Sequence, residues 1–181
     1  MGDHDAEDRL AALVREHQGA VVAYARRRLG DWQAAEDLAA EVFVVAWRRQ
    51  HDVPQQPRPW LYGVARRLLL NEFRRRARRD ATERALLKPP PSVDDPAVRV
   101  TETDRVVRAL RGLRESDREL LMLIGWEGLT VGEAATVLAA VPAVVSVRLY
   151  RARQRLARLL AEFENVEGAH SPADVRRVRS A

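Results

Sequence analysis

Arginine is concentrated in one short stretch of the chain, and its side-chain chemistry suits the binding of anions. The stretch RLLLNEFRRRARR, residues 67–79, has six arginines and one acidic residue. A guanidinium group presents a planar set of N–H donors that matches a phosphate or the edge of a guanine. The same stretch contains three leucines and a phenylalanine, so it also has an apolar side. These residue types predict a rigid cationic surface for an anionic partner.

A helical register separates the two kinds of side chain. At about 100° per residue, one side of the helix collects Leu61, Tyr62, Ala65, Leu68, Leu69 and Phe73. The other side collects Trp60, Val64, Arg67, Asn71, Arg74 and Arg78, with Arg75 beside them. Tryptophan rings stack on unpaired bases, asparagine amides bond adenine edges, and arginines follow phosphates. The stripe indicates a nucleic-acid surface, although a solvated face with Trp60 packed on the preceding loop explains it equally well.

The preceding helical segment has a charged strip between two apolar faces. Leu38, Val42 and Val45 share one face, and Phe43 and Trp47 lie nearly opposite. Between them run Asp37, Glu41, Val44 and Arg48, at intervals of three or four residues. If other helices pack on both apolar faces, only the charged strip stays exposed, and it can bind a protein partner. The alternative is that these charges only keep the helix surface solvated.

Nothing in the sequence combines into a catalytic or metal site. Glu36, Asp37 and Glu41 have no nucleophile, metal ligand or Gly-rich phosphate loop beside them. The absence of cysteine excludes disulfides and thiolate metal sites and suits a reducing cytoplasm. The four histidines lack metal-ligand spacing, and His17 is expected to be a packed residue of the first helix. We therefore expect no catalytic residues, no metal, no cofactor and no enzyme activity.

Length and charge narrow the class further. The chain has 181 residues, 46% of them hydrophobic, and a net charge of +5, with arginine as every basic residue except Lys88. These values fit one domain or two small ones with an anionic partner, either nucleic acid or an acidic membrane surface. The acidic N-terminus is no signal peptide, and no apolar run is long enough to span a bilayer. We expect a cytoplasmic protein without membrane insertion.

The elements that position these residues are all predicted to be helices. The spacing predicts helices at 6–29, 33–50, 59–79, 102–113, 117–125, 131–138 and 142–163. Gly30 is expected to end the first and Asp31 to cap the second, with capping boxes at SDRE (116–119) and TVGE (130–133). The fold class is thus all-α, with domains 6–84 and 105–163. A proline-rich flexible linker at 85–104 joins them, and 164–181 form a mobile tail.

The second domain has the order of a helix-turn-helix. A short capped helix is followed by the turn AAV and by a longer helix from Pro142. The inward stripe of that helix is Val145, Leu149, Ala152, Leu156, Leu159 and Phe163. Arg151, Gln154 and Arg158 point the other way, flanked by Ser146 and Tyr150 on one side and Arg148 and Arg155 on the other. A plain three-helix bundle would show the same pattern.

Together the two domains resemble a sigma factor of the sigma-70 family, in the small extracytoplasmic-function (ECF) class. AEDLAAEVFVVAWRR resembles the region that docks on core RNA polymerase. PWLYGVARRLLLNEFRRRARR resembles the region that melts and reads the −10 promoter element. Residues 109–138, followed by VRLYRARQRL at 147–156, resemble the region that reads the −35 element. The resemblance implies a sigma-2-like helical bundle and a sigma-4-like helix-turn-helix domain. It also places the loop QHDVPQQPRP, residues 50–59, where the family captures a flipped −10 base.

The resemblance implies a promoter-specificity factor whose partners are core RNA polymerase and promoter DNA. Polymerase contacts are assigned to Asp37, Glu41 and Arg48. Contacts to −10 DNA are assigned to Trp60, Arg67, Asn71, Arg74, Arg75 and Arg78. Contacts to −35 DNA are assigned to Ser146, Arg148, Tyr150, Arg151 and Arg155. Whether an anti-sigma factor also binds is left open.

The turn of the helix-turn-helix departs from the family pattern. Val141 stands where the family has a capping serine, and Val144, Ser146 and Val147 replace threonine, lysine and serine. Earlier in the chain, Ala40 stands where the family has glutamine. Two alternatives therefore remain: a dimeric helix-turn-helix regulator that acts without polymerase, and a helical adaptor that has lost DNA binding.

Overall fold

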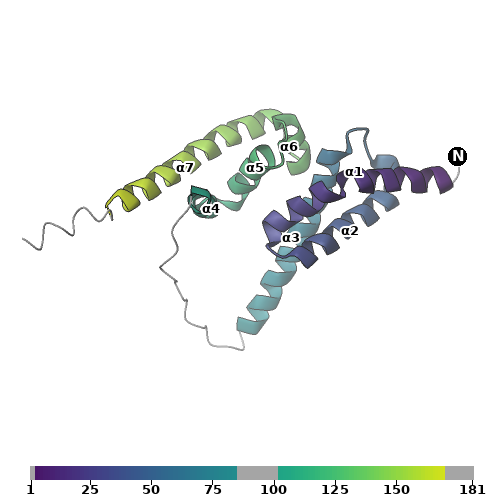
Figure 1. Cartoon of the computed structure of the whole chain (residues 1–181), viewed down its shortest axis with the longest axis horizontal. Coiled ribbons are helices and arrows are strands. Elements are labelled where there is room, and N and C mark those ends of the chain that lie inside the picture. The colour runs from purple at the N-terminus through teal and green to yellow at the C-terminus, as the bar shows by residue number, and fades with distance from the viewer. Residues whose placement is uncertain (1–2, 85–101, 170–181) are drawn as a thin grey trace, which may run out of the picture. The chain divides into compact units, whose positions relative to one another are not determined.

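The computed structural model describes residues 3–84 and 102–169, and all regular structure in these ranges is helical (Figure 1). The helices are α1 (Asp3–Leu29), α2 (Trp32–Arg48), a 3₁₀ helix η1 (Gln50–Asp52), α3 (Pro57–Arg84), α4 (Glu102–Gly112), α5 (Glu115–Gly125), α6 (Val131–Leu138) and α7 (Pro142–Ala169). The predicted all-α class is confirmed for the described residues. The predicted linker and tail lie outside them, except that α4 begins at Glu102 and α7 continues to Ala169.

Most of the predicted helix ends are confirmed by their hydrogen bonds. Gly30 follows α1 with a φ of +73°, the left-handed conformation that glycine adopts without strain. Asp31 caps α2, because its Oδ1 accepts a 2.6 Å hydrogen bond from the Ala34 N–H. The capping box at SDRE is wrong: the N-cap of α5 is Arg114, whose carbonyl accepts from the Asp117 N–H. Ser116 therefore lies inside the first turn.

The capping box at the start of α6 is present and should make stability depend on pH. The Glu133 carboxylate accepts hydrogen bonds from the Thr130 N–H and hydroxyl, both at 2.7 Å. These bonds, the backbone one first, lower the pKa of Glu133 below its usual 4.5. A lowered carboxyl pKa stabilises the fold above pH 4.5, and this contribution disappears as the pH falls through the folded-state pKa.

We expect Glu133→Gln to lower the free energy of unfolding at pH 7, and the difference from wild type to shrink as the pH falls below 4.5. Urea unfolding followed by circular dichroism at several pH values measures this. Thr130→Ala is the control, because it removes the cap itself and should cost about 1 kcal/mol. A Glu133→Gln deficit that stays constant down to pH 3 would contradict the charge-dependent contribution.

Contacts between Cα atoms divide the chain into two compact units. The first contains α1, α2 and α3, together with α6. Its core includes Val21, Tyr24, Val42, Leu61 and Tyr62, all 1% exposed or less. The rings of Tyr24 on α1 and Tyr62 on α3 are stacked with centroids 4.9 Å apart, which fixes the two helices against each other.

The second unit contains α4, α5 and α7. Leu120 and Leu123 of α5 pack with Val145 of α7 in its core, and all three are fully buried. At the end of α4, a Cβ added to Gly112 would meet Leu159 Cδ1 at 3.3 Å, so glycine allows α4 to approach α7 closely. This grouping puts α6 in the other unit, whereas the predicted domain 105–163 includes it. The domain boundaries themselves stay a prediction.

Candidate nucleic-acid interface

The cationic stripe of α3 is solvent-exposed. Arg67, Asn71, Arg74, Arg75 and Arg78 are all exposed, and Trp60 in the first turn is half-buried. Val64 is different: it follows Gly63, where α6 approaches α3, and it is only 3% exposed. The stripe therefore consists of a half-buried aromatic ring at one end and an amide with four arginines towards the other.

The apolar side of α3 is buried only in its first half. Leu61, Ala65 and Leu69 are 2% exposed or less, whereas Leu68 is half-buried and Phe73 is 36% exposed. No residue from Asn71 to Arg78 is buried, because this part of α3 extends beyond α1 and α2 (Figure 1). Leu68 and Phe73 share the predicted apolar side of α3, but they are only partly covered. The packed half of α3 holds the projecting, arginine-rich half in place.

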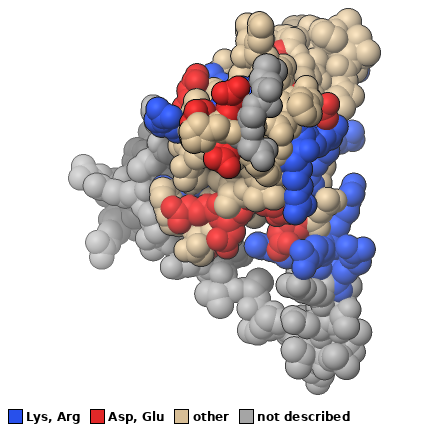
Figure 2. Space-filling view, turned by 90° about the vertical axis from the view of Figure 1, so that its right-hand side faces the viewer, with Lys and Arg blue, Asp and Glu red and all other residues tan. Residues whose placement is uncertain are grey.

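Intrahelical hydrogen bonds orient some of the arginines. The Arg67 Nε donates to the Gly63 carbonyl at 3.2 Å, and the Arg76 Nε donates to Glu72 at 2.9 Å. Arg75 lies 4.0 Å from the same carboxylate. One acidic side chain thus accompanies several arginines, and the surface stays cationic. In the space-filling view, arginines gather along one edge, largely apart from the acidic side chains (Figure 2).

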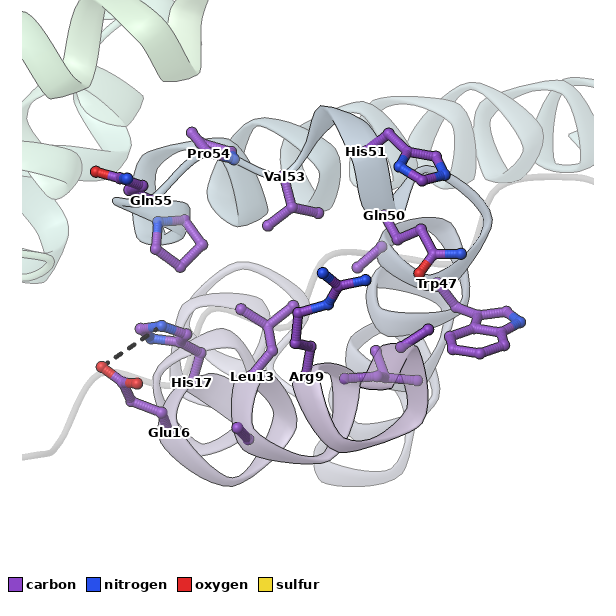
Figure 3. A pocket seen from close by; sticks show the side chains of 15 residues that line it. Arg9, Leu13, Glu16, His17, Trp47, Gln50, His51, Val53, Pro54 and Gln55 are labelled. Atoms are coloured by element: carbon purple, nitrogen blue, oxygen red, sulfur yellow. Dashed lines mark ion pairs between the residues drawn. The ribbon is translucent and has the colours of Figure 1, made fainter. Parts of the chain in front are cut away.

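A pocket opens beside the loop between α2 and α3. It has a volume of about 520 Å³ and is lined by the first half of α1, the end of α2 and residues 50–57. Arg9 and Leu13 of α1 point towards Val53 of the loop, with Gln50 beside them (Figure 3). The Gln50 Oε1 is buried and accepts no hydrogen bond from the described residues. The pocket thus offers a cation, an unpaired amide oxygen and apolar walls to a small planar ligand.

Sequence reasoning singled out the loop of this pocket but not its other wall. His17 was expected to be packed, and its side chain is 12% exposed, 3.7 Å from Glu16. The sequence does not predict that Arg9 and Gln50 line one pocket. They lie about 40 residues apart and come together only because α1 packs on α2. The three prolines of the loop were the available signal.

The charged strip of α2 is exposed as predicted. Asp37, Glu41, Val44 and Arg48 all face solvent, while Leu38, Val42 and Phe43 on the two flanking faces are buried. An apolar groove of about 750 Å³ borders the strip, lined by residues that include Leu10 and Val14 of α1 and Phe43, Val44 and Trp47 of α2. Acidic groups beside an apolar groove suit a protein partner with a basic, amphipathic surface.

On α7, the predicted inward and outward stripes separate clearly. Val145, Leu149 and Ala152 are buried, whereas Arg151 and Arg158 are exposed. The Ser146 hydroxyl donates back to the Pro142 carbonyl at 3.1 Å. Tyr150 is 65% exposed, and its hydroxyl accepts a 2.7 Å hydrogen bond from Gln154. The exposed stripe is therefore available to a ligand.

Two arginines on the flank of α7 have partners on α5. Arg155 forms an ion pair with Asp117, whose carboxylate is almost fully buried. Arg148 donates to the Ser116 carbonyl at 3.3 Å. The Arg155 side chain is 46% exposed, so it is the loss of Arg155 that would leave a buried charge, the Asp117 carboxylate, uncompensated. The predicted contact residues Arg148 and Arg155 thus link α7 to α5 in this structure, and Arg151 and Arg153 between them are exposed.

Residues 3–84 and 102–169 contain neither a metal-binding cluster of side chains nor a single membrane-spanning helix. No three side chains among His, Asp and Glu there are grouped so that they could hold a metal ion. No single helix in the same ranges is long and apolar enough to cross a membrane, although α6 and α7 pass that test when counted together.

Two family models match the chain. The model described as "Sigma-70 region 2" matches residues 13–79, and the model described as "Sigma-70, region 4" matches residues 103–156. The first match contains α2, most of α1 and most of α3. The second contains α4, α5, α6 and the first half of α7.

Curated relatives match along most of the chain. It is 31% identical over 170 residues to the probable RNA polymerase sigma factor RfaY of Xanthomonas campestris, matching 88% of this chain and 42% of that protein. It is 30% identical over 162 residues to the ECF sigma factor BldN of Streptomyces coelicolor, matching 86% of this chain and 61% of that protein. The ECF sigma factor SigL of Mycobacterium tuberculosis is 28% identical, with 85% of this chain matching 90% of it.

Two solved structures are similar over more than four fifths of the chain. One is the sigma factor RpoE in complex with the anti-sigma factor NepR from Bartonella quintana, with a TM-score of 0.63 and 24% identity, covering 83% of this chain and 96% of that one. The other is CnrH in complex with the cytosolic domain of CnrY, with a TM-score of 0.60 and 27% identity, covering 86% and 90%.

Proposed function

The chain belongs to the sigma-70 family, in its extracytoplasmic-function class, and on this premise we propose that it is a promoter-specificity factor of RNA polymerase. It binds core RNA polymerase in the cytoplasm, recognises the −35 and −10 promoter elements and assists strand opening. It contributes recognition and has no catalytic role of its own.

The exposed stripe of α3 is the observation that carries this proposal. Arg67, Arg74, Arg75 and Arg78 track the phosphates of promoter DNA, because arginine pairs with phosphate in a planar, bidentate geometry. Asn71 offers its amide to a base edge, and Trp60 offers a ring on which an unpaired base stacks. The projection of this half of α3 leaves room for a DNA strand along it.

The pocket beside residues 50–57 has a role in the same proposal. Its volume of about 520 Å³ lies within the range of about 300–1,000 Å³ that is typical of small-ligand sites. A base flipped out of the −10 element enters it, and Arg9 and the Gln50 amide bond its polar edge. Two prolines, Pro54 and Pro57, restrict the loop and limit the entropy lost on binding.

The protein partners are assigned to α2 and its neighbourhood. Asp37, Glu41 and Arg48 contact core polymerase along the exposed strip, and the apolar groove receives an apolar side of the same partner. An anti-sigma factor is part of the proposal, because CnrH was solved with the cytosolic domain of another protein.

Genome-wide run-off transcription tests the proposal as a whole. The full-length protein is added to purified core polymerase and fragmented genomic DNA, and the transcripts are mapped. We expect a small set of start sites that share two elements and that are absent without the protein. A protein that neither binds core polymerase nor changes its start sites would overturn the proposal.

Arg151 is expected to supply affinity for −35 DNA without choosing its sequence. Arg151→Ala should weaken holoenzyme binding to all −35 sequences similarly and reduce the slope of log affinity against log salt by about one contact. Fluorescence anisotropy at several salt concentrations measures both. Arg108→Ala, an exposed arginine of α4, is the matched control with the same loss of charge. An effect confined to one base position would show instead that Arg151 reads a base.

A further inference from the structure

The first two turns of α7 expose large apolar side chains that the proposed function leaves unexplained. Val144 is 52% exposed, Val147 is 50% exposed and Tyr150 is 65% exposed. The inward residues of the same turns, Val145 and Leu149, already fill the core of the second unit. About half of each exposed valine is therefore left uncovered by the described residues, and this exposure costs hydrophobic free energy until a partner covers it.

The charges around these valines indicate what covers them. At about 100° per residue, Val144, Val147, Arg151 and Arg158 share one stripe, and all are exposed. Between Pro142 and Arg158 the helix has five arginines and no acidic residue. The partner must therefore be anionic along most of the stripe and must present small apolar groups to its first two turns.

Duplex DNA has this combination in its major groove. Phosphates line both edges, and the C5-methyl group of each thymine is the apolar group on the groove floor. Aliphatic side chains distinguish thymine from the other bases by contact with this methyl group. A valine side chain on a helix that lies in the groove ends in two methyl groups and has no hydrogen-bonding atom that would demand a polar partner.

We propose that Val144 and Val147 read thymine methyl groups in the −35 element, while Arg151 holds the adjacent phosphates. This inference rests on the proposed function, because it requires α7 to lie in the major groove of promoter DNA. Under this inference, the protein prefers its −35 sequence because of apolar contacts to bases, and not because of hydrogen bonds from the first turns of α7.

Uracil substitution tests the proposal, since uracil pairs like thymine but lacks the methyl group. The probe is the −35 duplex that the holoenzyme selects from a library randomised at six base pairs, resynthesised with uracil at each thymine in turn. Burying one methyl group contributes about 0.8 kcal/mol, so we expect about fourfold weaker holoenzyme binding at one or two positions. Uracil elsewhere in the duplex should have no effect.

The double variant Val144→Ala/Val147→Ala identifies the protein side of the contact. Both residues are exposed and alanine favours helix, so the fold should be retained. We expect this variant to bind thymine and uracil duplexes equally and to keep its salt dependence. Arg151→Ala should weaken both duplexes and keep the fourfold difference between them.

The outcomes separate this inference from the proposed function. Equal binding of thymine and uracil duplexes by the wild-type holoenzyme overturns the inference and leaves the promoter-binding function standing. The inference is also overturned if the double variant keeps the fourfold difference between the duplexes. It is overturned as well if the double variant binds DNA normally and loses only a protein partner, because the valines would then be a docking surface for protein. If the holoenzyme selects no −35 sequence at all, both the inference and the −35 part of the proposed function fail.

Discussion

Replacing Asp37 and Glu41 together by arginine is expected to abolish co-purification with core RNA polymerase. Both carboxylates are exposed on the strip of α2 beside the apolar groove, so neither substitution removes a packing contact. If they meet a basic surface, reversal places like charges opposite one another, which costs several kcal/mol. We expect affinity to fall roughly 100-fold or more, measured by equilibrium binding of labelled protein to core polymerase.

The matched control is the reversal of Asp5 and Asp8, two exposed acidic residues of α1 at a similar spacing. It changes the net charge by the same amount, so it separates a local contact from a general electrostatic effect. Equal losses in the two double variants would mean that net charge alone decides the affinity. Wild-type affinity after reversal of Asp37 and Glu41 would show that polymerase binds elsewhere.

Trp60→Ala should leave polymerase binding intact and reduce open-complex formation about 5- to 150-fold. The range follows from the loss of one base-stacking contact, about 1–3 kcal/mol. Trp60 is half-buried in the first turn of α3, so circular dichroism must first show unchanged helix content. Permanganate footprinting of unpaired thymines on a promoter found by run-off transcription measures the effect.

Trp32→Ala provides the control, because Trp32 is a 54% exposed tryptophan on the same helical unit, beside Arg26 rather than on the α3 stripe. It should leave open-complex formation unchanged. Promoter DNA with a pre-melted −10 element should rescue part of the Trp60→Ala defect. Loss of polymerase binding by Trp60→Ala at unchanged helix content would remove the assignment of the α3 stripe to promoter DNA.

The helices of this protein were predictable because each depends on a periodic pattern within its own sequence. The apolar residues of α2 and of the first half of α3 are spaced for one buried face, and Gly30, Asp31 and Thr130 mark helix ends by local hydrogen bonding. The end of α3 was less predictable. Phe73 follows the apolar spacing, but α1 and α2 end before it along α3 (Figure 1), so it is 36% exposed.

Partners distant in sequence account for most of what the sequence did not reveal. Arg148 and Arg155 are arginines at positions spaced like those of an exposed, DNA-contacting helix face. Their partners on α5 lie 32 and 38 residues earlier in the chain, so no local pattern reveals them. Residues 116–119, SDRE, match the sequence pattern of a capping box at the start of α5. The structure instead buries Asp117 in an ion pair with Arg155, and the helix begins earlier. Val64 is buried where α6 approaches, a contact that no local pattern specifies.

On α7, the residues that pack against other helices differ from those that face solvent, and this affects how the protein can evolve. Val145, Leu149, Ala152 and Arg155 hold the helix on its neighbours, whereas Val144, Val147 and Arg151 are exposed. Mutations at the outward positions should drift almost free of selection for stability, because surface substitutions change stability by only about 0.5 kcal/mol or less. If Val144 and Val147 choose the −35 sequence as proposed, a lineage of such proteins can diverge in its promoters while its scaffold stays constant. Exchanging these two side chains should then change the preferred −35 sequence.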